Sequence, residues 1–245
     1  NPLHMFAEET DRASLLAPGD GPPVAVTEAD GPAPLVLACE HASNRLPAAL
    51  GTLGLSAGAL ESHIAWDPGA LAVASRIAGS FGAPLVAARF SRLAYDVNRP
   101  PDRADAVTPL SETTPVPGNA GLDAAARRLR AAALHDPFHA ALDRVLDSHR
   151  AAALITVHSF TPVYRGVRRT VELGLLHDRD DRLARAMLAR APALTGLAAA
   201  LNEPYGPGDG VTHTLRRHAL GAGIPNVMIE IRSDLIADAP AQHRV

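Results

Sequence analysis

Short apolar runs alternate with longer stretches of helical spacing along most of the chain. The run PLVLAC at residues 34–39 is apolar throughout, which is typical of a strand buried on both faces of a sheet. Further runs of strand length lie at residues 83–90, 153–157, 170–176, 196–201 and 226–231. Helix signals lie at residues 56–62, 69–79, 122–150 with a break near Pro137, 180–190 and 213–220. The alternation predicts an α/β fold, as a single three-layer domain with a mixed, mostly parallel sheet.

Two segments fall outside this alternation. Residues 1–30 are predicted to be an amino-terminal extension of the single domain at 1–245, and the first four, before Met5, look like an added segment rather than a targeting signal. Residues 98–119 read NRPPDRADAVTPLSETTPVPGN and have no periodicity. Because so long a loop in a compact domain is usually functional, we predict a lid at residues 100–119.

Composition narrows the classes of function. No apolar run approaches the roughly 18 residues of a membrane span, so a membrane protein is excluded. The single cysteine, Cys39, excludes a disulfide framework and fits a reducing compartment, so we expect a cytoplasmic protein. A formal net charge of -3 argues against a nucleic-acid partner. All 23 basic residues are arginine, which excludes Schiff-base and P-loop lysine chemistry. We therefore expect a small-molecule partner, with a homo-oligomer left open.

Polar side chains gather where the predicted strands end. Open α/β sheets bind ligands outside the carboxyl ends of their strands, so these side chains are expected to form one site. They are Glu40, His41 and Asn44 after the first strand, Arg92, Asp96, Asn98 and Arg99 after the second, His158 and Ser159 after the third, and Glu230, Arg232 and Asp234 at the last.

Two of these residues have the chemistry of metal ligands. His41 and His158 each leave a buried strand at its rim, where rigid ligands are best held. Either one alone could equally be a hydrogen-bonded structural histidine. For a third ligand we choose Asp67, with Glu40 and His63 behind it. Asp67 also precedes Pro68, as the N-cap of a helix would, and that interpretation has equal weight.

A glutamate lies inside the last apolar run, NVMIEIRSD. Carboxylates are rarely buried without a partner or a function, and Glu230 with a raised pKa could serve as general base and then general acid. Its structural alternative is an ion pair with Arg232 or Arg92.

Arginines cluster in RFSRLAYDVNRPP. Arginine forks bind carboxylates with two hydrogen bonds, so Arg92, Asn98 and Arg99 are predicted to hold an anionic substrate. The alternative is a structural bridge between Arg92 and Asp96, and both can hold at once.

Two other features are given little weight. His135 and His139 have the spacing of a zinc-binding helix, but Pro137 between them would distort that helix. Cys39 is expected to be a small core residue rather than a nucleophile.

Six segments together resemble the N-formylglutamate amidohydrolase family, in the same order and over residues 34–236. The most specific is the SR pair followed by NRPP, and HSF and IEIR add to it. The segments are CEHASNRLP, HIAWDPGA, RFSRLAYDVNRPP, TVHSF, DGVTHTLRRHA and VMIEIRSDLI. The resemblance is closer to the predicted branch of the family than to its histidine-degradation enzymes.

The resemblance implies a zinc-dependent hydrolase with a phosphorylase/hydrolase-like fold, distantly similar to zinc carboxypeptidases. Those enzymes bind zinc through two histidines and the glutamate of an HxxE motif. By this resemblance His41 and His158 are the histidine ligands, Asn98 and Arg99 bind a substrate carboxylate, and Glu230 is the base. Asn44 stands where the motif has its glutamate, so the third ligand stays open and Asp67 is our choice.

These observations lead to one main hypothesis. The chain is expected to hydrolyse the N-acyl, most simply N-formyl, group of an acidic amino acid such as N-formyl-L-glutamate, with one zinc ion per chain. Arg232 and Ser159 would help to bind the substrate, and His213 or His218 would close over the site or stabilise the oxyanion. The alternatives are a zinc peptidase or deacylase acting on peptide or cell-wall fragments, and a metal-free protein that binds small anions.

Overall fold

The first predicted strand lies in the middle layer of the molecule. In the computed structural model, which describes residues 14–29, 33–149 and 153–245, this strand is β2, Val36–Cys39. Val36 and Ala38 face one apolar core, whereas Leu37 and Cys39 face a second core on the opposite side of the sheet. All four residues are buried, as the unbroken apolar run predicted, and Cys39 is a core residue.

The main sheet is mixed and mostly parallel, as predicted. Its strand order is β1-β3-β2-β6-β11-β9-β10. Strands β3, β2, β6 and β11 are parallel neighbours, β1 and β9 run antiparallel to β3 and β11, and β10 is parallel to β9. The remaining bounds are β1 Val24–Thr27, β3 Leu85–Ala88, β6 Leu154–Phe160, β9 Leu173–Leu176, β10 Ala199–Leu201 and β11 Asn226–Arg232.

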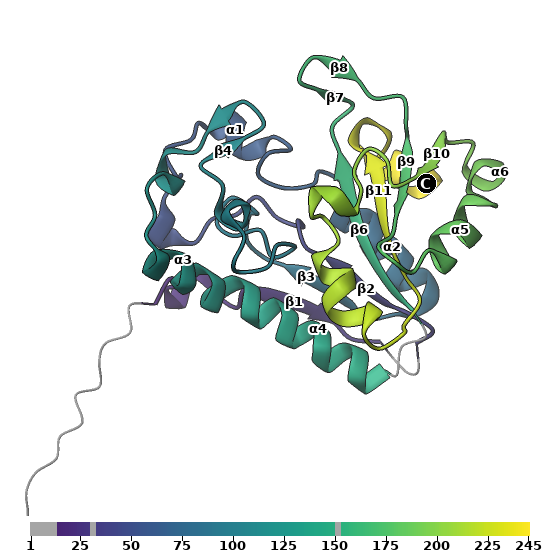
Figure 1. Ribbon diagram of the computed structural model, residues 1–245, viewed down its shortest axis with the longest axis horizontal. Helices are drawn as coiled ribbons and strands as arrows, with labels where there is room; N and C mark the ends of the chain where they lie inside the picture. The colour runs from purple at the N-terminus through teal and green to yellow at the C-terminus, as the bar shows by residue number, and fades with distance from the viewer. Residues whose placement is uncertain (1–13, 30–32, 150–152) are drawn as a thin grey trace, which may run out of the picture.

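Helices cover both faces of the sheet and complete three layers (Figure 1). One face carries α2, Ala70–Phe81, and α5, Arg182–Leu188, and α8, Ala239–Arg244, packs on α2. The other face carries α4, Asp136–His149, and the short α7, His213–Leu215. The remaining helices are α1 Ala57–Glu61, which Ser56 caps, α3 Ala124–Arg130 and α6 Ala191–Thr195.

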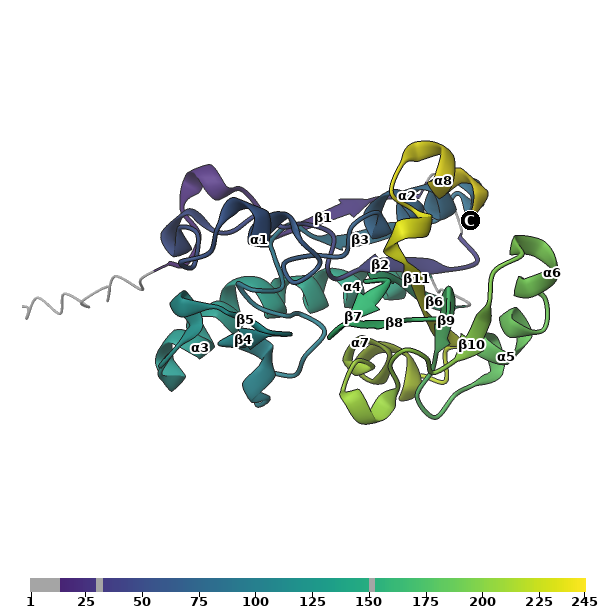
Figure 2. The ribbon, with the colours of Figure 1, turned by 90° about the horizontal axis from the view of Figure 1, so that it is seen from above.

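Long connections at one end of the molecule hold small elements of their own. Figure 2 shows α1, α3 and the β4–β5 hairpin at one end and α5, α6 and β10 at the other. The hairpin pairs β4, Leu110–Ser111, with β5, Thr114–Pro115, inside the segment expected to be a lid. A second hairpin pairs β7, Val163–Tyr164, with β8, Val167–Arg168.

The structure departs from the sequence prediction at several elements. β1 lies within the expected amino-terminal extension, and it pairs with β3 at the edge of the sheet. The helical stretch predicted at 122–150 is two helices joined by a π-helical turn, Ala131–His135, just before Pro137. Proline has no amide hydrogen and clashes with the preceding turn, which accounts for the changed register. α6 and the two hairpins are too short for periodicity to predict.

Some expectations concern residues that the structure does not describe. The segment before Met5 and the end of the predicted helix at Arg150 lie outside the described residues. Among the described helices, none combines the length and apolar character that crossing a bilayer requires.

Candidate active site

Neighbouring strands bring predicted site residues together on one face of the sheet. Glu230 of β11 lies opposite His158 of β6 in the register. Residues two apart on a strand point the same way, so these side chains share the face of the core residues Leu154 and Met228. His41 follows β2, which lies next to β6. A cavity of about 300 Å³ opens where these residues meet.

Most of the predicted site residues line this cavity. They are His41, Asp67, Arg92, Asn98, Arg99, His158, Ser159 and Glu230. Arg232 and His213 do not line it and are described below.

Three buried side chains point their polar atoms at one another. Nδ1 of His41 lies 3.2 Å from Oδ2 of Asp67, and Nδ1 of His158 lies 2.8 Å from the same oxygen. The two Nδ1 atoms are 3.2 Å apart. The backbone amide of Ser159 donates a hydrogen bond of 3.3 Å to Asp67 Oδ2. The three side chains form a compact group that could hold a metal ion.

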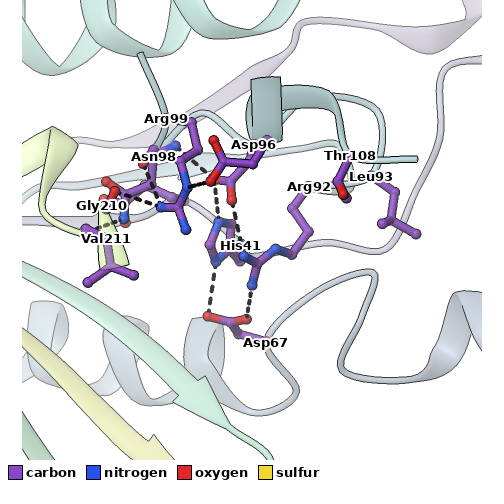
Figure 3. Close-up of polar contacts among 12 residues, drawn as sticks. His41, Asp67, Arg92, Leu93, Asp96, Asn98, Arg99, Thr108, Gly210 and Val211 are labelled. Atoms are coloured by element: carbon purple, nitrogen blue, oxygen red, sulfur yellow. Dashed lines mark hydrogen bonds and ion pairs between the residues drawn. The ribbon is translucent and has the colours of Figure 1, made fainter. Parts of the chain in front are cut away.

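The other nitrogen of each imidazole faces a carboxylate. Nε2 of His41 lies 2.8 Å from Oδ1 of Asp96 (Figure 3). Nε2 of His158 lies 3.1 Å from Oε2 of Glu40. A carboxylate favours the tautomer with its hydrogen on Nε2, which leaves the lone pair on Nδ1. Histidines that bind metals are oriented in this way, with the second nitrogen on a carboxylate or carbonyl.

This arrangement fits a divalent cation. Two Nδ1 lone pairs and a carboxylate oxygen of Asp67 all accept, so without a positive charge between them they repel one another. A tetrahedral zinc ion with bonds of about 2.0–2.1 Å has ligand atoms about 3.3 Å apart. Two of the three distances above, both 3.2 Å, are close to this separation, and the third is shorter at 2.8 Å. His41, Asp67 and His158 could therefore supply three ligands to such an ion.

The opposite charges within this group shift the pKa values of its side chains. Burial lowers the pKa of His158, but Glu40 and Asp67 outweigh burial and raise it well above its usual value. Burial raises the pKa of Asp67, but His41 and His158 outweigh burial and hold it far below its usual value. Both shifts favour a positive charge next to the carboxylate of Asp67.

The two alternative third ligands have other partners. Glu40 contacts the outer nitrogen of His158, and His63 lies 2.8 Å from Glu112. The N-cap of α2 is Gly69 rather than Asp67, so the carboxylate of Asp67 is not used to cap that helix.

Glu230 differs from the carboxylates around it. Burial raises the pKa of Glu230 to about 7, although the nearby His158 lowers it. Its Oε2 atom is buried and has no hydrogen-bond partner among the described residues. Arg232 and Arg92, its expected ion-pair partners, contact other carboxylates. A carboxyl group that lines a cavity and has a pKa near neutral pH can accept a proton and return it.

Arg92 is both a structural and an accessible side chain. Its Nη2 donates a 3.0 Å hydrogen bond to Oδ2 of Asp96, and its Nη1 lies 3.6 Å from Oδ1 of Asp67 (Figure 3). The predicted bridge between Arg92 and Asp96 is therefore present. The side chain keeps 29% of its surface exposed, at the cavity, so it can also contact an anion there.

Asn98 and Arg99 are held by the segment before α7 (Figure 3). Asn98 donates to the carbonyl of Val211 and accepts two hydrogen bonds from Thr214. Arg99 uses Nε on Asp105 and Nη1 on the carbonyls of Asn98 and Gly210. None of the hydrogen bonds among the described residues uses Arg99 Nη2, so its hydrogens could bind an anion.

Two predicted site residues lie elsewhere. Arg232 ends β11, and its guanidinium donates to Asp234 at 2.8 Å and to Glu172 at 3.2 Å. His213 begins α7 and stacks on His135 instead of facing the cavity.

Sequence reasoning did not find the aromatic side of the cavity. Tyr164 and Tyr205 line it, and the guanidinium of Arg169 lies over both rings. The chain has only three tyrosines, and two of them lie here, which is the signal that composition offered. The segment expected to be a lid contributes Ser111 and Glu112 to the lining.

The sequence and the fold of the chain are similar to those of known proteins. The chain is similar to the gene product Atu2144 of Agrobacterium tumefaciens, with 51% identity, a TM-score of 0.89, and coverage of 93% of this chain and 92% of that one. Its fold is similar to that of N-formylglutamate amidohydrolase from Ralstonia eutropha JMP134, with 21% identity, a TM-score of 0.64, and coverage of 91% and 93%. No curated protein matches the sequence.

The match to a family covers every strand of the main sheet except β1, and it covers the whole cavity. Residues 33–237 match the sequence profile of a family described as N-formylglutamate amidohydrolase. That span includes every residue that lines the cavity, from His41 to Glu230. The chain therefore belongs to the N-formylglutamate amidohydrolase family.

Proposed function

We propose that this chain is a zinc-dependent amidohydrolase that removes the N-formyl or a similar short N-acyl group from an acidic amino acid such as N-formyl-L-glutamate. The observation that carries the proposal is the group of acceptors His41, Asp67 and His158, beside Glu230, whose Oε2 has no hydrogen-bond partner among the described residues. Family membership supports hydrolysis of an amide, and the Ralstonia neighbour is itself named for N-formylglutamate.

His41, Asp67 and His158 would hold the zinc ion. Bound there, zinc supplies Lewis-acid chemistry, which polarises a carbonyl and lowers the pKa of water to about 7. The role of the chain is to keep the three ligands in place, and Asp96 and Glu40 do so by fixing the two imidazoles.

Glu230 would transfer the proton. Its raised pKa lets it accept a proton from water near neutral pH and return that proton to the leaving amine. It lies opposite His158 in the register, so its carboxyl group projects from the same face of the sheet as the metal group. The absence of an ion-pair partner for Glu230 among the described residues keeps its carboxyl group free for this role.

The arginines would bind and orient the substrate. The side chain of Arg92 is partly exposed and lines the cavity, and no hydrogen bond among the described residues uses Nη2 of Arg99. Two separate cations suit the two carboxylates of an N-acylated acidic amino acid, with Asn98 and Ser159 beside them. Arg232 and His213 lie outside the cavity and have no part in this proposal.

The segment 100–119 would close the site. Ser111 and Glu112 at the turn of the β4–β5 hairpin reach the cavity, where Glu112 accepts a hydrogen bond from the backbone of Arg165 and contacts His63. The hairpin is thus tied to the β7–β8 hairpin across the cavity. Opening of these contacts would admit the substrate, and closing would exclude water.

The test combines metal content with hydrolysis. Protein prepared without chelator is measured for zinc per chain and for formate released from N-formyl-L-glutamate, in the wild type and in His41→Ala and His158→Ala. The His243→Gln variant, at an exposed position on α8, is the matched control. We expect each site variant to bind about one zinc fewer and to lose hydrolysis, while the control keeps both.

Two results would contradict the proposal. Folded wild type that takes up no zinc at this group and releases no formate would favour a metal-free anion-binding protein. Cleavage of peptides in preference to single N-acyl amino acids would favour a peptidase.

A further inference from the structure

A second group of histidines lies apart from the cavity. His135 and His139 flank Pro137 at the start of α4, and His213 and His218 belong to the segment of α7 and the π-helical turn that follows it, Arg216–Leu220. His135, His139 and His218 are buried. None of the four lines the cavity of the candidate active site.

Three of these rings are oriented from outside by hydrogen-bond acceptors. Nε2 of His139 donates to the carbonyl of Val97 at 2.9 Å, because a carbonyl oxygen can only accept. Nδ1 of His135 lies 2.8 Å from Asp136 Oδ1, and Nδ1 of His218 lies 2.7 Å from Oδ1 of Asp143. Each ring therefore has its hydrogen on the outer nitrogen and its lone pair on the inner one.

The inner nitrogens lie close to one another. Nδ1 of His139 is 2.7 Å from Nε2 of His218, and Nε2 of His135 is 3.2 Å from Nε2 of His213. At the first contact two lone pairs face each other when both rings are neutral, and such a contact needs a cation or an added proton.

The separations between these imidazole nitrogens suit ligands of a metal ion. His135, His139 and His213 each offer a nitrogen, and the three nitrogens lie within 4.8 Å of one another. The contact of 3.2 Å between His135 and His213 is close to the separation of about 3.3 Å that two ligands of one tetrahedral zinc ion have. Outer contacts to Asp136 and the carbonyl of Val97 are those that orient histidine ligands.

The backbone around this group is unusual in the same places. A π-helical turn ends at His135, and a second one contains His218. Such turns are rare and are found frequently at functional sites. The sequence argued against a common site because Pro137 would distort a helix that carries both His135 and His139. In the structure the register changes in the turn that ends at His135, and α4 continues from Asp136 through His139.

We propose that His135, His139 and His213 bind a second divalent transition-metal ion, of the zinc class that imidazole ligands favour, with His218 as the adjacent fourth imidazole. This ion would join the start of α4 to α7. Because Thr214 holds Asn98 and His139 holds the carbonyl of Val97, the ion would also fix the loop that carries Asn98 and Arg99. Its role is structural, and it does not depend on the proposed function.

Counting zinc in matched variants tests this site separately from the first. The full chain is stripped with chelator, loaded with zinc, freed of excess by gel filtration and measured for zinc per chain. The variants are His135→Gln/His213→Gln for the second group and His41→Ala/His158→Ala for the first, with His243→Gln as control. We expect two ions in the wild type and control, and one in each double variant.

Each other outcome has a defined meaning. One ion in the wild type that is lost only in His135→Gln/His213→Gln supports the second site and contradicts the active-site zinc. A zinc count that this double variant leaves unchanged overturns the second site, as does a wild type that takes up no zinc.

If the double variant fails to fold, crystals of the zinc-loaded wild type decide the question. Anomalous scattering at the zinc edge should give a peak between His135 and His213. A map with a peak at His41 and none at His135 would overturn the proposal.

Discussion

A single carboxyl group, Glu230, should control the chemical step. We predict that Glu230→Gln lowers kcat by about 10²- to 10⁴-fold, the usual contribution of a general acid–base group, because the amide cannot accept the proton. The size and burial of the side chain are unchanged, so zinc content and KM should stay near those of the wild type. Hydrolysis of N-formyl-L-glutamate with the wild-type kcat would contradict the role of Glu230.

Asp20 should make stability depend on pH in the acid range. Its carboxylate accepts hydrogen bonds from the amides of Ala17 and Ala48, and these hold its pKa below the usual value. A lowered folded-state pKa stabilises the protein above the unfolded-state pKa of about 3.9, and the benefit is lost as the pH falls through the folded-state pKa. The wild type should therefore exceed Asp20→Asn in urea midpoint at neutral pH, with the difference shrinking in acid. A difference that stays constant down to acid pH would contradict this account.

The sequence could predict the positions mainly of those site residues that lie at the ends of strands. His41, His158 and Glu230 could be placed together because parallel neighbouring strands end at one edge. Arg232 shares the face of Glu230 by strand alternation, yet Glu172 and Asp234 bind its guanidinium outside the cavity. His213 faces away because α7 and α4 pack together, and one sequence does not encode such a tertiary contact in a readable pattern.

At the scale of elements, the turn that carries Asp67 depends on one glycine. Gly69 has a φ of +83°, and a Cβ atom there would lie 2.5 Å from the carbonyl oxygen of Ile236. We predict that Gly69→Ala costs about 2 kcal/mol or more in unfolding free energy and weakens zinc binding, because Asp67 must shift with the turn.

Gly79 lies within α2, the helix that Gly69 precedes, and it is the matched control. It is exposed, and a Cβ atom there would meet nothing within 4 Å. Gly79→Ala should raise the unfolding free energy by about 0.5–1 kcal/mol, since alanine favours helix more than glycine does. Equal effects of the two substitutions on denaturation midpoint and zinc affinity would show that the Gly69 turn is not required.

Elements long enough to show a period were predictable, and short ones were not. β2, β6 and β11 are buried on both faces and were predicted from their apolar runs. β7 and β8 have two residues each, too few for alternation to be visible. The π-helical turns depend on how Pro137 and the packing of α7 change the hydrogen-bond register, which spacing alone does not reveal.

At the scale of the whole molecule, the match to the family begins at residue 33, after β1. A chain that starts there would lack β1 and expose the outer edge of β3, along Leu85–Ala88, where β1 now pairs at four positions. Unpaired amides and carbonyls on a sheet edge recruit further strands. We expect this shortened protein to form large particles by light scattering, and a chain that starts at residue 14 to remain monodisperse. A monodisperse protein starting at residue 33 would show that β1 is dispensable.

We therefore expect β1 to limit self-association of the chain. β1 covers the edge of β3 and is itself only four residues long, and a very short edge strand offers a second molecule few groups to pair with. The residues that line the cavity all come later in the sequence, so we expect β1 to keep the protein dispersed without contributing to the cavity itself.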